Sequence, residues 1–349
     1  MNFRVTTGMM MNNYNYNLMS STNQLNDAST KVQTGRNFSS YSEDPTGATL
    51  AWSMRRSLWR NENALQNTRT TMAKVQVAWT VAGTVVDSYG LDAKSSIVEA
   101  LNDPTGTGRQ VLGIELQEVA DSMVNALNGQ YTDKFVFSGD DGSTVPFSWC
   151  EDTGNLLYRG VNVNASPGTA DYYKLKEMTG ENENNFVDVG LGLSETEGAN
   201  GTLVDTTAFN NAFSGIDFTG FGVDEDGDPK NLVSLVKEIG DLLASCDPDS
   251  GAYPDASVAE DASRLLDKFS AALDYSTGQY VELDVKQTFL KANETYLIDA
   301  RDNMNERITD IEDVDPAEAI MEMSWQQYCY TACLQIGTQI LSQSLLDYM

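Results

Sequence analysis

The sequence predicts a mainly α protein with a small inserted β-rich domain. In this fold, the N- and C-terminal segments form a long antiparallel helical coiled-coil rod, and the β-rich domain lies at its far end. Three observations predict it: heptad-spaced apolar residues at both ends, long helical patterns next to them, and a middle rich in Gly, Asn, Thr and Asp. With 349 residues, the chain is also too long for one compact core, so two or more domains are expected.

The first helix is expected over residues 8–33. Its seam residues alternate at spacings of three and four, which lines one stripe of an α-helix and is typical of a coiled coil. They are Met11, Tyr14, Leu18, Ser21, Leu25, Ala28 and Val32. Turn-forming residues from Thr34 to Gly47 end this helix, and Pro45 suits the first turn of the next one.

The same alternation continues from Ala51 to Tyr89 and extends the pattern of the second helix as far as Leu101. The segment Asp103–Gly106 stops it, and a third helix follows over residues 112–127. From about residue 139 the pattern changes to short aromatic and β-branched runs between turn formers. The candidate strands are Leu156–Tyr158, Tyr172–Leu175 and Phe186–Val189.

Helical periodicity resumes at Leu232 and predicts helices over 232–243, near 257–274, and over 283–311, where Leu or another apolar residue recurs every seven positions. A final helix starts at Pro316. Its stripe is Ile320, Met323, Gln327, Tyr330, Leu334, Gly337, Leu341, Ser344 and Tyr348. These patterns predict three parts: a terminal assembly domain (1–45 with 316–349), a helical rod domain (46–138 with 231–315) and the β-rich surface domain (139–230).

Charge and composition argue against several classes of function. The net charge is −29, with 22 Lys and Arg against 51 Asp and Glu, and the chain has no histidine. The sequence therefore predicts no basic patch large enough to neutralise several phosphates, and nucleic-acid binding is not expected. Without His, the commonest general base and the commonest zinc ligand are both missing, so the sequence predicts no enzyme.

Two motifs have a functional and a structural interpretation. Asp224–Pro229 resembles the start of a calcium loop, but Pro229 and Leu235 stand where that loop needs other residues, so an acidic turn is favoured. Cys329 and Cys333 lie four residues apart on one helix face, and small buried hydrophobes are favoured over half a metal site. The sequence predicts no catalytic residue, no metal ligand and no cofactor.

The N-terminal segment lacks the apolar core of a cleavable signal peptide. The longest weakly polar stretch, Val75 to Val86, is too short to span a bilayer. These features predict no membrane contact, and either a cytoplasmic protein or one exported by a route that cleaves nothing.

At this point, five marks in chain order resemble the flagellins, and within them the flagellin-like hook-associated proteins of the hook–filament junction. The marks are Arg4-Val5-Thr6 with Met9-Met10, Thr34-Gly35-Arg36 with Ser42-Glu43-Asp44-Pro45, Tyr131 to Gly139, Arg307 to Ala319, and Ser344 to Met349. The Met pair and the Leu-Leu-Asp-Tyr ending look like the junction proteins, whereas flagellins tend to end in Leu-Leu-Arg.

The resemblance implies a structural protein of the extracellular bacterial flagellum that joins the hook to the flagellin filament. It implies export through the flagellar type III apparatus, an export chaperone in the cytoplasm, and a ring of copies between flagellin and the other hook-associated junction protein. No catalysis is implied. Two alternatives stay open: a filament flagellin, and a secreted adhesin or carbohydrate-active protein whose β-rich domain is carried on a helical stalk.

The two apolar ends must be covered by each other or by other subunits, and the heptads alone leave both options open. We expect the assembly interface to use the apolar residues of both terminal segments. They are Val5, Met9, Met10, Tyr14, Leu18, Leu25, Val32, Ile320, Met323, Tyr330, Leu334, Leu341, Leu345 and Leu346.

Overall fold

The computed structural model describes residues 7–102, 108–151, 153–180, 182–192, 207–247 and 250–346, without the side chains of residues 7, 256 and 340–346. The chain forms two compact units. Unit 1 contains residues 1–62 and 298–349, and unit 2 contains residues 63–297. The expected break at Asp103–Gly106 lies outside the described residues, as do Tyr348 and the side chains of Leu341 and Ser344 of the predicted terminal stripe.

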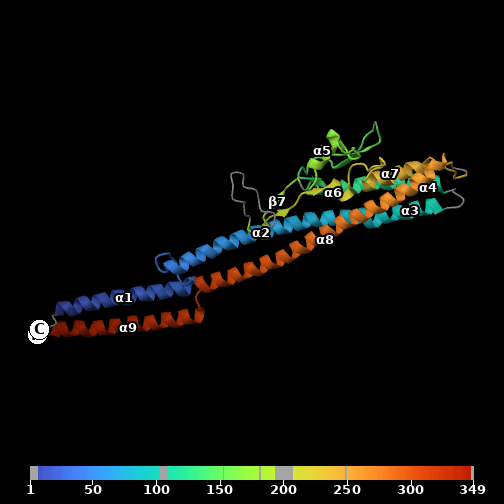
Figure 1. Cartoon of the computed structure of the whole chain (residues 1–349). Coiled ribbons are helices and arrows are strands. Elements are labelled where there is room, and N and C mark those ends of the chain that lie inside the picture. Colours follow the sequence, from blue (N-terminus) through green and yellow to red (C-terminus); the bar gives the residue numbers. More distant parts are fainter. Residues whose placement is uncertain are drawn as a thin grey trace. The chain divides into compact units, whose positions relative to one another are not determined.

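In unit 1, helices α1 (Thr7–Thr34) and α9 (Pro316–Leu346) lie side by side in antiparallel directions (Figure 1). Two contacts fix this direction. Lys31, near the end of α1, pairs with Glu322, near the start of α9, at 3.5 Å. Tyr14, near the start of α1, lies against Gly337 of α9. The expected pairing of the two terminal segments is therefore present within one chain.

The two connectors of unit 1 hydrogen-bond to each other. The link from α1 to α2 (Pro45–Gly83) meets the link from α8 (Ala256–Glu312) to α9. Asn37 is the centre of this contact: its backbone N–H donates to Glu312 O at 2.7 Å, and its side-chain amide donates to Asp313 O at 2.8 Å. Because both connectors are tied at one place, the end of α1 and the start of α9 lie next to each other.

Unit 2 is built mainly from helices. After α2 come a π-helical segment η1 (Thr84–Gly90), α3 (Leu91–Asn102), α4 (Arg109–Leu127), α7 (Leu232–Ala244) and the long α8. Helices α4 and α7 approach closely where Gly113 faces Gly240. A Cβ atom on Gly240 would lie 3.0 Å from the Gly113 carbonyl oxygen, so side chains larger than hydrogen would push these backbones apart.

The β elements of unit 2 are short antiparallel pairs. Their bounds are β1 (Gln130–Tyr131), β2 (Lys134–Phe135), β3 (Ser138–Gly139), β4 (Phe147–Trp149), β5 (Leu156–Tyr158), β6 (Val161–Asn162), β7 (Phe186–Val187), β8 (Phe209–Asn210) and β9 (Phe213–Ser214). Strands β4, β5 and β6 form a three-stranded sheet, and β1–β2, β3–β9 and β7–β8 are pairs. Two short helices, α5 (Ala170–Glu177) and α6 (Gly215–Thr219), lie among them.

One hydrophobic core joins the helices and the strands of unit 2. The largest fully buried side chains come from both kinds of element, for example Met123 and Leu127 on α4, Tyr158 on β5 and Phe269 on α8. The Tyr158 hydroxyl donates to the Phe137 carbonyl at 3.0 Å, and burial raises the pKa of Tyr158 to about 12. The β elements are therefore integrated with the helices by a shared apolar interior.

The predicted fold class, mainly α with a small β-rich part, is confirmed. The strand at Leu156–Tyr158 is confirmed, and the one at Phe186–Val189 is shortened to Phe186–Val187. The strand predicted at Tyr172–Leu175 is wrong, because these residues lie in α5. The Thr169 hydroxyl caps that helix by accepting from Tyr172 N at 3.3 Å, and this local cap outweighs the β propensity of two tyrosines.

Helix α8 differs from expectation in one further respect. The helix predicted near 257–274 and the one over 283–311 are a single helix.

The three-part domain division stays a prediction. Among the described helices, none is long and apolar enough to cross a membrane.

Asn231 holds the start of α7 in the interior of unit 2. Its side-chain oxygen accepts from Val233 N at 3.0 Å and Ser234 N at 3.1 Å, and its amide donates to Thr219 Oγ1 and Gly220 O, both at 2.7 Å. The residue is fully buried. One side chain therefore satisfies two helix N–H groups and fastens the preceding loop.

We expect Asn231→Ala to lower the free energy of unfolding by about 2–3 kcal/mol, since it removes a cap and leaves buried polar groups unpaired. Asn231→Asp keeps the cap acceptor but loses the donors, so its loss should be smaller. Chemical denaturation followed by circular dichroism measures both. The exposed Asn303→Ala on α8 is the control, and an Asn231→Ala protein as stable as this control would contradict the interpretation.

Candidate assembly surface

The buried seam of α1 follows the predicted heptads. Tyr14, Leu18, Leu25 and Val32 are half-buried, and Ala28 is buried with 2% of its surface exposed. Their side chains face α9, as expected if the two terminal helices cover each other. The structure thus brings together four of the predicted assembly residues of the N-terminal segment.

The residues of α9 that face α1 differ from the predicted stripe at every second position. Met323, Tyr330 and Gly337 face α1 as predicted, but Ala319 and Cys333 take the places expected for Ile320 and Leu334. Ile320 and Leu334 are exposed, at 51% and 40%. The small residues Ala319, Cys333 and Gly337 allow the helices to approach closely, and the Tyr14 ring fills the position of a Gly337 side chain.

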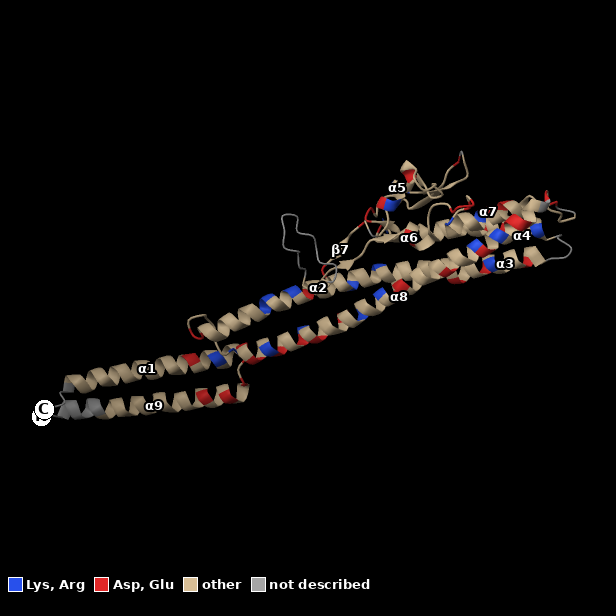
Figure 2. Ribbon diagram, viewed as in Figure 1, with Lys and Arg blue, Asp and Glu red and all other residues tan. Residues whose placement is uncertain are grey.

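The outer face of α9 carries a second apolar stripe that the sequence interpretation missed. Met321, Trp325, Tyr328 and Ile336 recur at spacings of four, three and eight and are exposed at 52–67%. The rings of Trp325 and Tyr328 lie 6.0 Å apart. Figure 2 shows few charged residues along α9 beyond its first turns. A search for helices that are apolar on every side would have found this stripe.

Helix α1 also exposes apolar residues away from the seam. Met9 and Met10, both predicted, are exposed at 57% and 42%, and Tyr16 and Met19 are exposed at 76% and 69%. Val5 lies outside the described residues, as do the side chains of Leu341, Leu345 and Leu346. The paired helices α1 and α9 therefore present large apolar groups outward after covering each other, which is typical of surfaces that bind further protein chains.

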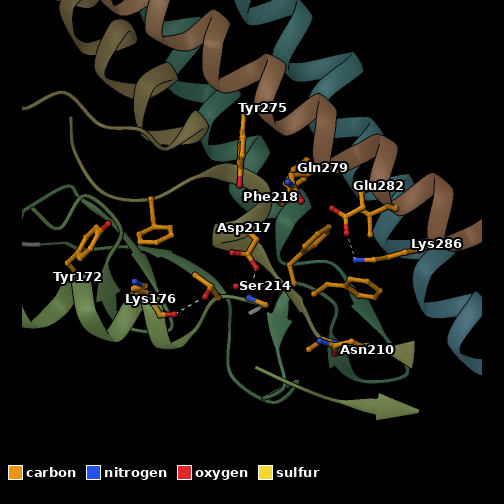
Figure 3. Close-up of a pocket in the computed structure, with 17 residues that line it drawn as sticks. Tyr172, Lys176, Asn210, Ser214, Asp217, Phe218, Tyr275, Gln279, Glu282 and Lys286 are labelled. Carbon is orange, nitrogen blue, oxygen red and sulfur yellow. Dashed lines mark hydrogen bonds and ion pairs between the residues drawn. The ribbon is translucent and has the colours of Figure 1, made fainter. Parts of the chain in front are cut away.

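A cavity of about 520 Å³ opens in unit 2 (Figure 3). Tyr275, Gln279, Glu282 and Lys286 line one side of it from a single face of α8. The other side is formed by α5, α6 and the ends of β8 and β9. Its size lies in the range of small-molecule sites, so its charged groups are candidates for a binding or catalytic role.

The two carboxylates of the cavity have intramolecular partners. Asp217 accepts a hydrogen bond from Gly180 N at 2.5 Å, and Glu282 pairs with Lys286 at 2.8 Å (Figure 3). A glycoside hydrolase needs one carboxyl group as an acid and a second as a base or nucleophile, both facing the substrate. Instead, Asp217 ties α6 to the loop at Gly180, and Glu282 pairs with a lysine one turn along its own helix.

The carboxylates of the acidic turn that resembles a calcium loop bind a lysine side chain of α8. The Lys268 ammonium lies 2.6 Å from Asp224, 2.8 Å from Asp226 and 2.5 Å from Asp228. Arg264 adds a hydrogen bond to Asp228 at 2.9 Å. The three carboxylates could coordinate a metal ion, but the Lys268 ammonium already contacts all three, which supports the interpretation as a structural acidic turn.

The comparison with protein families matches residues 5–141 to the bacterial flagellin N-terminal helical region. This match confirms the resemblance to the flagellins over the N-terminal part of the chain. The matched segment includes α1, α2 and α4, whose helical pattern the sequence predicted. Residues 5–141 are thus similar to the helical region of flagellins. No curated protein sequence matches the chain.

Solved structures share the fold over a larger part of the chain. A protein described as a flagellar hook-associated protein from Vibrio parahaemolyticus has a TM-score of 0.57 and 15% identity, covering 78% of this chain and 100% of its own. The flagellar hook-associated protein-3 from Legionella pneumophila has a TM-score of 0.51 and 12% identity, covering 74% and 97%. At such identities the comparison shows a shared fold. This chain therefore has the same fold as these two proteins over about three quarters of its length.

We expect Gly337→Ala to loosen the α1–α9 pair, because its new methyl group requires the Tyr14 ring to leave the seam. Elsewhere in a helix, Gly→Ala raises stability by about 1 kcal/mol. Gly278 on α8 is a matched control, since a Cβ atom there meets nothing within 4 Å. Hydrogen exchange of the α1 amides measures the effect. Gly278→Ala should leave α1 exchange unchanged, and α1 exchange as slow in Gly337→Ala as in the wild type would contradict the close approach at Gly337.

We expect Lys268→Met to lower the melting temperature at pH 7 by a few degrees, because three carboxylates then lie together without their ammonium. Arg264, followed by Lys268, lowers the pKa of Asp228 below its usual 3.8, with burial opposing. The stabilisation is thus present above pH 3.8 and is lost as the pH falls through the lowered pKa.

The melting temperatures of the wild-type and Lys268→Met proteins should converge as the pH falls below 3.8. Lys291→Met, which removes an exposed cation from the same helix, is the control for the change in net charge. A difference that persists unchanged at low pH would show that the lysine stabilises the protein through its alkyl chain instead.

Proposed function

We propose that this protein is a structural component of the bacterial flagellum that joins the hook to the flagellin filament. The single observation that carries the proposal is the exposed apolar face of α9, at Met321, Trp325, Tyr328 and Ile336. A helix that covers α1 on one side and exposes such residues on the other requires a second partner. The flagellin match over residues 5–141 supports a partner of flagellar type.

In this function, the two terminal helices bind neighbouring subunits by burying their outer faces. The partners are copies of the chain in a ring, flagellin on one side and the other hook-associated junction protein on the other. Before assembly, an export chaperone covers the C-terminal helix in the cytoplasm. The protein then acts outside the cell, at the hook–filament junction, after export without a cleaved signal peptide. It has no catalytic role.

The interface includes the fourteen residues predicted from the sequence. Their positions divide the described ones into two groups with different roles. Residues exposed in the single chain, such as Met9, Ile320 and Leu334, would contact other subunits directly. Residues in the α1–α9 seam, such as Leu18 and Leu25, would hold the two helices in their antiparallel pair, so that the exposed residues stay on its outer surface. Val5, Leu341, Leu345 and Leu346 remain in the proposal on sequence grounds.

The second candidate is a filament flagellin, which would use the same helices. The two possibilities differ in self-assembly, because a filament flagellin forms long homopolymers alone, whereas a junction protein forms limited rings and requires flagellin for extension. Electron microscopy of the purified chain, with and without flagellin, separates them. Long filaments from the chain alone would favour the filament flagellin.

A secreted adhesin or carbohydrate-active protein is the third candidate. The cavity of unit 2 is the feature that could serve it. Its carboxylates Asp217 and Glu282 are held by Gly180 and Lys286, so the cavity gives this candidate little support.

We expect Trp325→Ser combined with Tyr328→Ser to abolish filament growth at the hook without destabilising the chain, because both side chains are mostly exposed before assembly. Burial of such aromatic groups supplies much of the binding energy of an interface. Electron microscopy of cells whose only copy is the variant measures the outcome. Tyr173→Ser on α5 is the control, as this residue is 59% exposed in unit 2. Normal filaments in the double variant would contradict the proposed role of this face.

A further inference from the structure

The start of α2, within unit 1, carries an exposed stripe of tryptophan and arginine. Trp52, Arg56, Trp59 and Arg60 recur at spacings of four, three and one, so they share one helix face. Both tryptophans are 65% exposed, and the Arg56 guanidinium lies 5.9 Å from the Trp52 ring centre. We call these four residues the basic stripe.

The basic stripe is unusual for a chain with a net charge of −29. Tryptophan and arginine are the residues most enriched at the energetic centres of protein interfaces. Among the described residues, Arg55 pairs with Glu312, but neither Arg56 nor Arg60 has an ion-pair partner. The buried face of the same helix turn, at Ala51, lies on the other side. The basic stripe therefore has no role in the packing of its own chain.

The end of α8, also in unit 1, carries a stripe of the opposite charge. Asp299, Asp302, Glu306 and Asp310 recur at spacings of three, four and four, and all four are exposed. Asp302 pairs with its neighbour Arg301 at 2.7 Å, whereas the other three make no ion pair within the described part of the chain. We call these residues the acidic stripe. The half-buried Met304, Ile308 and Ile311 lie on the opposite face of the helix.

The two stripes match in length and spacing. Arg56 and Arg60 are one helical turn apart, about 6 Å, and so are Glu306 and Asp310. The acidic stripe spans about 16 Å of helix and the basic stripe about 12 Å. Each stripe lies opposite the buried face of its own helix, and Arg55 and Glu312 hold these helices together. One chain therefore cannot bring its own stripes into contact.

We propose that the basic stripe of one copy binds the acidic stripe of the next copy. The inference rests on the proposed function, because it requires the chain to assemble with itself. A contact between two different surfaces of identical chains is head-to-tail, so it repeats from copy to copy and builds a ring or a helix. The tryptophans supply buried apolar area, and the complementary charges set the register and suppress wrong pairings.

Charge reversal tests this contact with the full-length chain. Arg56→Glu with Arg60→Glu makes one stripe acidic, and Glu306→Arg with Asp310→Arg makes the other basic. Each double variant should self-associate at least tenfold more weakly than the wild type, because like charges then face each other. Sedimentation velocity at several salt concentrations measures this, with Lys176→Glu and Lys230→Glu in unit 2 as the charge-matched control.

Mixing the two double variants provides the decisive measurement. In an alternating assembly, each reversed basic stripe meets a reversed acidic stripe, and each wild-type stripe meets a wild-type one. The mixture should therefore associate as the wild type does, while each variant alone associates at least tenfold more weakly. Circular dichroism melts of each variant confirm that the separate chains are folded.

The outcomes separate the two proposals. If the wild type self-associates and both double variants do so equally well, the stripe contact is wrong and the junction function stands. If the variants self-associate normally but fail to bind flagellin, the basic stripe has a different partner and the inference is again wrong. A wild-type chain that neither self-associates nor supports filament growth would overturn both.

Discussion

The close antiparallel contact of α1 with α9 is the constraint on which the rest of unit 1 depends. Small residues on α9, Ala319, Cys333 and Gly337, face α1, and the Tyr14 ring lies where a Gly337 side chain would be. The large apolar residues Trp325 and Tyr328 lie on the other face of α9, outside this seam. The internal contact thus leaves an exposed apolar surface.

The two units combine different kinds of stabilisation. Unit 2 has one continuous apolar core, buried hydrogen-bonding side chains such as Asn231, and a cluster of ion pairs around Lys268. Unit 1 is a set of paired helices with little fully buried area and many exposed apolar groups. This difference agrees with the proposed function, since surfaces that bind other chains cannot also be buried in the monomer.

Most of the helical architecture could be predicted from the sequence, because the periodic apolar residues of α1, α2, α7 and α9 repeat over many turns. The errors came where local and long-range signals compete. Tyr172–Leu175 looked like a strand, but the Thr169 cap makes it a helix. The helices expected near 257–274 and over 283–311 are one helix, because no breaker separates them.

The sequence by itself determined the helical class, the inserted β elements and the resemblance to flagellins, since these depend on residue order alone. Only the tertiary structure decided which residues of α9 face α1. Met323, Tyr330 and Gly337 fit a stripe with Ile320 and Leu334 and also one with Ala319 and Cys333. The tertiary structure also placed Lys268 among three aspartates about forty residues away in the chain. Such contacts depend on close packing between distant segments, which periodicity cannot specify.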